Sequence, residues 1–124
     1  MSVLMPLAVR NLDAYRVALQ LVSALRPLCG QIAAVDKDLA RQLGRAAPSM
    51  PQNLAEGMRR TGRDRAHLLT VALGSTEEVR TIVDVVVAWG MLTAAEAAPL
   101  DELADRLCAM TFRLRQNAMC PNAM

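Results

Sequence analysis

At 124 residues and 13.4 kDa, the chain has the size of one domain and is too short for two independent hydrophobic cores. Hydrophobic residues make up 53% of it but aromatic residues only 2%, so the core must come from Leu, Val, Ala and Met, which suits packed helices better than a β-sandwich. The net charge of +2 is too small to define a partner. We therefore expect a single all-α domain over residues 1–118 and a flexible tail over residues 119–124.

The composition also excludes several classes of site. The three cysteines form no C-x-x-C pair and His67 is the only histidine, so we expect no disulfide framework, no metal, no cofactor and a reducing, cytoplasmic setting. The longest apolar segment, residues 85–95, falls well short of the roughly 20 residues that cross a bilayer. Residues 1–9 lack the basic start of a signal peptide. We expect no membrane association.

The first predicted helix covers residues 12–29 and stops at Gly30. Two neighbouring apolar stripes run along it at helical spacing, so its apolar face is wide. The stripes are Leu12, Tyr15, Leu19 and Val22 on one side, and Ala18, Leu21, Leu25 and Leu28 on the other.

The second predicted helix covers residues 36–60 and contains Pro48 and Pro51. Proline lacks a backbone donor, and its ring clashes with the carbonyl four residues earlier. The chain must therefore either kink at these prolines or stop and restart with Ser49 as an N-cap.

The third predicted helix covers residues 62–89 and ends at Gly90. Thr61 and Asp64 have the spacing of a capping box, in which the N-cap side chain and the side chain three residues later bond each other's backbone amides. A core seam runs along this helix, with an extra apolar stripe beside it. The seam is Leu68, Ala72, Ser75, Val79, Ile82, Val86 and Trp89, and the extra stripe is Leu69, Leu73, Val83 and Val87.

The fourth predicted helix covers residues 94–117 and begins at a strict capping box from Thr93 to Glu96. Pro99 lies close to this start, so a separate short first helix is one alternative. The core stripe of the helix is Leu100, Leu103, Leu107, Met110 and Leu114.

Four helices with short connections predict an antiparallel up-and-down four-helix bundle. The first and third helices each carry two apolar stripes, and a single thin bundle is not expected to bury both. We therefore expect the chain to associate with itself.

Two sequence motifs carry a family resemblance. Residues 49–57 read S-M-P-Q-N-L-A-E-G, and residues 72–78 read A-L-G-S-T-E-E. They resemble the S-I-P-x-N-I-A-E-G and A-L-G-S-x-x-E motifs of the 23S rRNA-intervening sequence proteins. The resemblance extends over about residues 11–115. It departs from the family at Tyr15, where members often have Trp, and at Gly44, which replaces one of two paired arginines.

The resemblance implies how the chain folds and assembles. It favours a kinked, nearly continuous second helix, and it implies a ring of five bundles, so we expect a homopentamer. In general architecture the chain is also distantly similar to the accessory variability protein of diversity-generating retroelements, a basic five-fold ring that works with a reverse transcriptase.

The polar residues of the motifs are interpreted as structural. Asn53, Glu56 and Arg60 have the spacing of a hydrogen-bonded network beside the proline kink. No second acid, base or metal partner stands at a useful spacing, and Glu77, Glu78 and His67 do not form the Glu-x-x-His pairs of di-iron bundles. We expect no catalytic or metal residues. The predicted structural set is Ser49, Pro51, Asn53, Glu56, Gly57, Gly74, Ser75 and Glu78.

Arginine is concentrated in one part of the sequence. Residues 41–65 hold six arginines against Glu56 and Asp64, a local charge of +4. The planar guanidinium suits phosphate, and because no aromatic side chain stands beside these arginines, contacts with nucleic acid would be with its backbone. An incidental solvated helix end is the alternative. The candidate nucleic-acid-binding residues are Arg41, Arg45, Arg59, Arg60, Arg63 and Arg65.

Two classes of function follow. The first is a non-catalytic, ring-forming protein whose basic surface binds structured RNA or acts as a nucleic-acid adaptor; the sequence does not distinguish RNA from DNA. The second is a protein-interaction scaffold that clusters other proteins on the ring, with no nucleic-acid role. An enzyme is a distant third.

Overall fold

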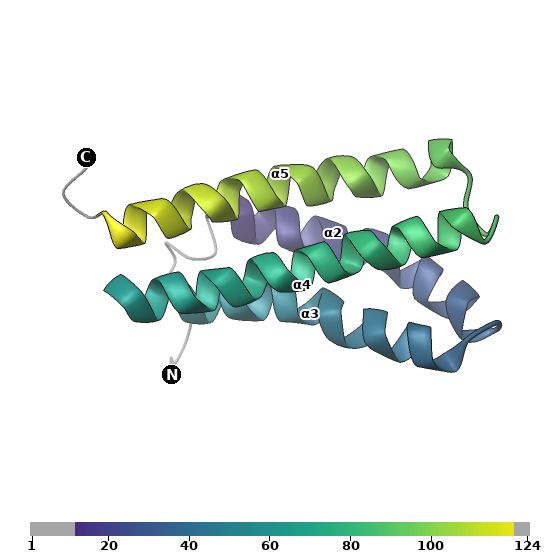
Figure 1. The fold of residues 1–124 in the computed structure, drawn as a ribbon, viewed down its shortest axis with the longest axis horizontal. Coiled ribbons are helices and arrows are strands. Elements are labelled where there is room, and N and C mark those ends of the chain that lie inside the picture. Colours follow the sequence, from purple (N-terminus) through teal and green to yellow (C-terminus); the bar gives the residue numbers. More distant parts are fainter. Residues whose placement is uncertain (1–11, 121–124) are drawn as a thin grey trace.

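The computed structural model describes residues 12–120, and in this range the regular structure consists of four α-helices with no strand. The helices are α2 (Asp13–Ala33), α3 (Lys37–Met58), α4 (Gly62–Ala88) and α5 (Ala94–Met119). They form a four-helix bundle in which α2 and α4 each pack against both α3 and α5. In Figure 1, α4 runs from its teal end to its green end, and α5 returns beside it from green to yellow. The predicted all-helical bundle is confirmed.

Two predictions fall largely outside this range. The absence of a signal peptide concerns residues 1–9, and all but the first two residues of the predicted tail lie beyond residue 120. Met119, the first of those two, still belongs to α5. None of the helices in the described part of the chain has the length and apolar character needed to cross a membrane.

Helix α2 is longer than predicted. It passes through Pro27 and Gly30 and ends at Ala33, so the predicted stop at Gly30 is wrong. The physical reason is Ile32, which continues the buried stripe one turn beyond Leu28 and is completely buried. Burying an Ile side chain gains about 1.5–3 kcal/mol, more than the roughly 1 kcal/mol that glycine costs inside a helix.

Helix α3 is continuous through both of its prolines, as the kinked alternative predicts. Figure 1 shows it changing direction near its middle. It begins after Asp36, whose side chain accepts a hydrogen bond from the Leu39 amide at 3.0 Å, and it ends at Met58, two residues earlier than predicted. Ser49 lies inside the helix and is not an N-cap.

Helix α4 starts where predicted, but without the predicted capping box. The side chain of Thr61 makes no capping hydrogen bond, and Asp64 lies exposed in the first turn. Gly62, the first helical residue, instead has a left-handed backbone with φ of 56°. The helix ends before Gly90, whose φ is 79°, as expected of a glycine that terminates a helix.

Helix α5 begins with the predicted capping box. The Glu96 amide donates to the Thr93 hydroxyl at 3.0 Å, and the Thr93 amide donates to the Glu96 carboxylate at 2.9 Å. Pro99 does not separate a short first helix, because α5 continues through it.

The core is one apolar cluster with contributions from all four helices. Helix α4 buries Val79 and Val86 from its seam, and it also buries Leu69 and Val83 from the extra stripe, each to 2% exposure or less. A single bundle therefore does bury residues from both stripes of this helix, because α4 packs against both α3 and α5; Leu73 and Val87 of the extra stripe are half-buried. Trp89, predicted in the seam, is 51% exposed and lies outside the core.

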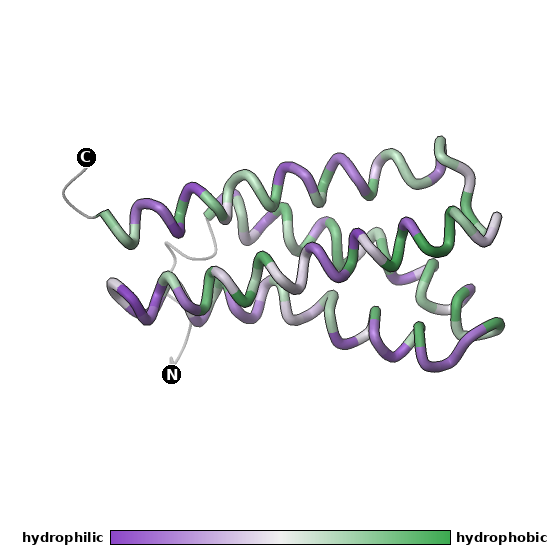
Figure 2. The backbone as a smooth tube through the Cα atoms, in the orientation of Figure 1, coloured by the Kyte–Doolittle hydropathy of each residue, from purple (hydrophilic) through white to green (hydrophobic). Residues whose placement is uncertain are grey.

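Helix α2 behaves differently from α4. Its inner stripe is buried, but on the outer stripe Leu19 is 44% exposed, and Tyr15 and Val22 are only half-buried. Figure 2 shows hydrophobic and hydrophilic residues alternating along each helix, as expected where one face turns to the core and the other to solvent. Exposed apolar side chains thus remain on both helices, Leu19 on α2 and Val71 on α4.

Candidate nucleic-acid interface

The two sequence motifs meet where α3 crosses α4. The hydroxyl oxygens of Ser49 and Ser75 lie 2.7 Å apart and share a hydrogen bond between the helices. Asn53 donates to both the hydroxyl and the carbonyl oxygen of Ser49, each at 2.9 Å. These three residues form a polar clamp that fixes α3 on α4 next to Pro51, which is itself buried. The clamp gives Ser49 and Asn53 of the motif a structural role beside the buried Pro51.

The remaining motif residues divide into two groups. Gly57 is buried, and a Cβ atom there would lie 3.3 Å from Cβ of Leu68, so glycine permits the close approach of α3 to α4. Gly74 and Glu78 are exposed; a Cβ on Gly74 would meet nothing within 4 Å, and Glu78 makes no hydrogen bond or ion pair within residues 12–120. The structure gives Gly57 a packing role and gives the other two none.

Glu56 holds two of the candidate arginines. The Arg60 guanidinium donates to one carboxylate oxygen from Nε at 3.1 Å and from Nη2 at 2.9 Å, and Nη1 of Arg59 lies 3.6 Å from the other oxygen. Asn53, predicted in the same network, belongs to the clamp instead. Because all three charged side chains are about half-exposed, the pairing leaves the arginines available to solvent and contributes little stability.

Arg65 has a structural role that sequence reasoning missed. From the first turn of α4 its guanidinium donates to the carbonyl oxygen of Gly57 at 3.2 Å and to that of Met58 at 2.9 Å. These carbonyls belong to the last turn of α3, where the regular helical donors four residues later are missing; the Gly57 carbonyl also accepts a hydrogen bond from the Arg60 amide at 3.0 Å. Arg65 is half-buried and closes the α3–α4 turn, so it is the least available of the six candidates.

The six candidate arginines do not form one surface. Arg41 pairs with Asp38 early in α3, and Arg45 lies one turn further along. Arg45 and Arg59 are 14 residues apart, which is about 20 Å along a helix. Arg41 and Arg45 are therefore separated from the group at the α3–α4 turn.

The end of α5 adds arginines that the sequence did not group with that turn. Arg115 donates to the Thr70 hydroxyl of α4 at 3.4 Å, and its guanidinium lies 5.0 Å from the centre of the Phe112 ring. Arg113 lines a hollow with the first residues of α2. In Figure 1, the yellow end of α5 lies at the same end of the bundle as the teal start of α4. The sequence signal that could have found this was the short α4–α5 connection, which predicts that the end of α5 packs beside the first half of α4, where Arg115 meets Thr70.

We call this region the basic end. Its exposed or half-exposed cations come from two helices, α4 and α5, and from the α3–α4 turn. Glu56 and Asp64 are the carboxylates nearest to them in sequence, and Asp13 lines the same hollow as Arg113. The basic end comprises Arg59, Arg60, Arg63, Arg113 and Arg115.

The opposite end of the bundle carries the opposite charge. Residues 81–105, which include the α4–α5 turn, contain five carboxylates and no Lys or Arg: Asp84, Glu96, Asp101, Glu102 and Asp105. The small net charge of the chain therefore conceals an uneven distribution: the basic end is rich in arginine, and the surroundings of the α4–α5 turn are rich in carboxylates, although Lys37 and Arg41 beside the α2–α3 turn lie at that end too (Figure 1).

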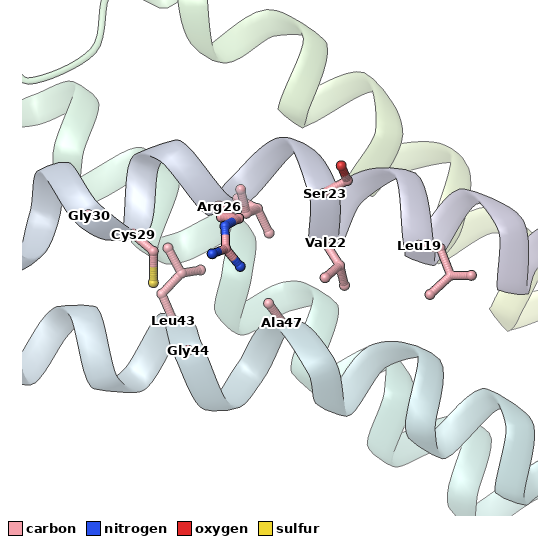
Figure 3. Close-up of a pocket in the computed structure, with 10 residues that line it drawn as sticks. Leu19, Val22, Ser23, Arg26, Cys29, Gly30, Leu43, Gly44 and Ala47 are labelled. Atoms are coloured by element: carbon pink, nitrogen blue, oxygen red, sulfur yellow. The ribbon is translucent and has the colours of Figure 1, made fainter.

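An open apolar groove of about 690 Å³ lies between α2 and α3 (Figure 3). Leu19 and Val22 from the outer stripe of α2 line it, as do Gly30 and Gly44, which have no side chains. Arg26 extends from α2 toward α3 in Figure 3 and makes no ion pair within residues 12–120. The groove thus combines apolar walls with a cation.

The groove also borders backbone carbonyls that lack a helical donor. Ser23, Gly44 and Ala47 line it, and the residues four positions after them are Pro27, Pro48 and Pro51. Proline has no amide hydrogen, so these three carbonyls receive no regular helical hydrogen bond. All three interior prolines of α2 and α3 thus remove a backbone hydrogen bond of their helix on the side that faces the groove.

Cys108 lies half-buried between α4 and α5. Burial, and after it the Glu77 carboxylate, raise the pKa of this thiol against the opposing effect of Arg80. The thiol therefore stays protonated near neutral pH and is not activated as a nucleophile. No group of three or more His, Cys, Asp or Glu side chains within residues 12–120 is placed to hold a metal ion.

The sequence profile of the 23S rRNA-intervening sequence protein family matches residues 10–113. The match contains α2, α3 and α4 completely and most of α5, and therefore includes the polar clamp and all of the basic end except Arg115. No curated protein sequence matches the chain at a significant level.

Proposed function

The chain belongs to the 23S rRNA-intervening sequence protein family, and we propose that it is a non-catalytic, ring-forming protein whose basic end binds the phosphate backbone of structured RNA. The observation that carries this proposal is the presence of five arginines from α4, α5 and the α3–α4 turn at one end of a bundle, whose other end has five carboxylates around the α4–α5 turn. A surface of this polarity orients a nucleic acid toward one end and repels it from the other.

The chemistry of the basic end supports contacts with phosphate and not with bases. Guanidinium groups bind phosphate oxygens through paired donors. Phe112, the aromatic residue at this end, already has Arg115 over its ring, so it is not a free platform for base stacking. Binding dominated by phosphate neutralisation has little sequence preference and weakens steeply as salt rises.

Assembly is the second part of the proposal. We infer an antiparallel up-and-down order of helices and a homopentamer in the cytoplasm. The partly exposed outer stripe of α2 supports self-association. A ring would repeat the basic end five times, which increases the number of phosphates that one particle contacts. Light scattering tests this part: the pentamer predicts five times the chain mass of 13.4 kDa, and any other mass contradicts it.

A filter-binding assay with a structured RNA at about 50 and 200 mM salt tests the binding. The logarithm of the affinity falls linearly with the logarithm of the salt concentration, and removing two phosphate contacts makes this slope shallower by about 2. It also weakens binding uniformly across sequences. We expect the double variant Arg60→Glu/Arg63→Glu to bind at least about tenfold more weakly at 50 mM salt. Its matched control is Arg45→Glu/Arg106→Glu, which makes the same charge change at two exposed arginines outside the basic end and should change affinity by less than about threefold.

The second candidate function is a protein-interaction scaffold, and the apolar groove is the observation that favours it. A scaffold predicts no RNA binding by the parent protein even at about 50 mM salt. That result, or equal binding by the parent and the Arg60→Glu/Arg63→Glu variant, would reject the nucleic-acid proposal and favour the scaffold.

A further inference from the structure

The groove between α2 and α3 is an apolar surface that one copy of the chain does not cover. Leu19 is 44% exposed on its wall. A Cβ atom built on Gly30 or Gly44 would meet nothing within 4 Å, so a helix laid in the groove can approach both backbones closely. A shallower hollow continues the groove toward Ala33 and Ala40. The surface has the length and shape to receive several turns of a helix.

One helix of this chain has a matching outer face. Along α5, exposed residues recur at spacings of three and four, which places them on a single face turned away from the bundle. The six residues are Ala95, Ala98, Glu102, Asp105, Ala109 and Phe112. Three of the six are alanines, which allow close approach at those positions. This α5 stripe spans about 25 Å along the helix.

The charges of the two surfaces are complementary. Arg26 projects between the helices of the groove (Figure 3), and the hollows that adjoin it are lined by Arg16 at one end and by Lys37 and Arg41 at the other. No Asp or Glu of the described residues lines any of these three hollows. The α5 stripe contributes Glu102 and Asp105; Asp105 also lies 3.8 Å from the guanidinium of Arg80, and Arg41 pairs with Asp38, so the complementary pair without such partners is Arg26 and Glu102.

We propose that the groove between α2 and α3 receives the α5 stripe of a second copy of this chain. The proposal rests on the ring assembly proposed above and names the surfaces that form it. Because groove and stripe are different surfaces, each copy offers one of each, and the contact is heterologous. Heterologous contacts close into a ring when the rotation between copies permits it. Arg59, Arg60 and Arg63 of the basic end lie outside this contact and stay available to RNA, whereas Arg115 stacks on Phe112 at the end of the stripe.

Cysteine cross-linking tests the contact directly, because Cys29 already lines the groove. In the full chain with Cys108→Ser and Cys120→Ser, a single cysteine is introduced on the stripe as Ala95→Cys, Ala98→Cys or Ala109→Cys. Mild oxidation should convert at least one of these variants into a ladder of covalent multimers on a non-reducing gel. Adding Cys29→Ser should abolish that ladder. Thr81→Cys, exposed on α4 and off the stripe, is the matched control and should give none.

Charge reversal gives a second readout that does not depend on oxidation. Arg26→Glu should reduce the assembly mass measured by light scattering to that of one 13.4 kDa chain while leaving the circular dichroism spectrum unchanged, because Arg26 is exposed and outside the core. Combining Arg26→Glu with Glu102→Arg and Asp105→Arg should restore the assembly, because the charges across the contact are again opposite.

The proposal is overturned if no stripe cysteine cross-links to Cys29, if Thr81→Cys cross-links equally well, or if Arg26→Glu assembles like the parent. If the parent protein has the mass of five chains but any of these three results is observed, the ring exists and other surfaces form it. A groove filled by residues 1–9 of the same chain would show as a ladder that appears only after these residues are deleted. RNA binding is measured separately, so its failure does not affect this test.

Discussion

The two turns beside α4 reverse the chain in the same way but are stabilised differently. Both use a glycine with a left-handed backbone, Gly62 at φ of 56° and Gly90 at φ of 79°. The α4–α5 turn is closed by a local capping box that spans four residues. The α3–α4 turn has no side-chain cap and is closed by Arg65, which reaches back seven and eight residues to the end of α3.

The two turns also differ in the charge of the residues around them. The α4–α5 turn lies among carboxylates, and the α3–α4 turn lies among arginines. At the arginine-rich turn, one cation stabilises the fold and its neighbours remain exposed. Arginines that are neighbours in the sequence therefore need not share a role. Here Arg65 is bound to the end of α3, while the arginines next to it remain exposed and can contact a ligand.

The largest expected change in stability comes from replacing Arg65, compared with replacing its neighbour Arg63. Arg65→Ala removes two charge-assisted hydrogen bonds to the last carbonyls of α3 and should lower the free energy of unfolding by about 2 kcal/mol. Arg63→Ala removes an exposed cation and should change it by less than about 0.5 kcal/mol. Urea denaturation followed by circular dichroism measures both. Equal losses would show that Arg65 has no special role in closing the turn.

The next effect tests the feature that the two turns share. Gly62→Ala and Gly90→Ala should each cost about 1.5 kcal/mol, because a left-handed backbone is unfavourable for a residue with a Cβ atom. Neither new Cβ atom would meet another atom within 4 Å, so the cost comes from the backbone alone. Thermal denaturation of the two variants should give similar shifts. A neutral result at one glycine would mean that its turn relaxes to another conformation.

The smallest effect compares the two threonine N-caps. Thr93→Ala removes a capping hydrogen bond of 3.0 Å and should cost about 1 kcal/mol. Thr61→Ala removes no such bond and should cost less than about 0.5 kcal/mol. Urea titration of the pair gives the comparison. A larger loss for Thr61→Ala would contradict the difference between the turns.

Much of the fold could be predicted because the signals are local. The capping box at Thr93, the terminating role of Gly90 and the stripe of leucines on α5 depend on residues within one or two helical turns of each other. The end of α2 could not be predicted in the same way. Gly30 is a local stop signal, but the burial of Ile32 against other helices outweighs it.

The candidate site could be predicted only in part. The group from Arg59 to Arg63 is contiguous in the sequence and stays together in the structure. The separation of Arg41 and Arg45 from that group, the attachment of Arg65 to α3 and the arrival of Arg115 beside Thr70 depend on how helices pack. No local pattern contains that information.

By itself the sequence determined four helices, their apolar faces and the family motifs, because helix periodicity, caps and breakers act over a few residues. The tertiary structure alone decided which stripes were buried. Helix α4 packs against two neighbours and buries residues from both of its stripes, while the outer stripe of α2 stays partly exposed beside the groove. It also decided which arginines gather at one end. Burial and charge separation depend on which helices become neighbours, and that choice is made by the whole chain.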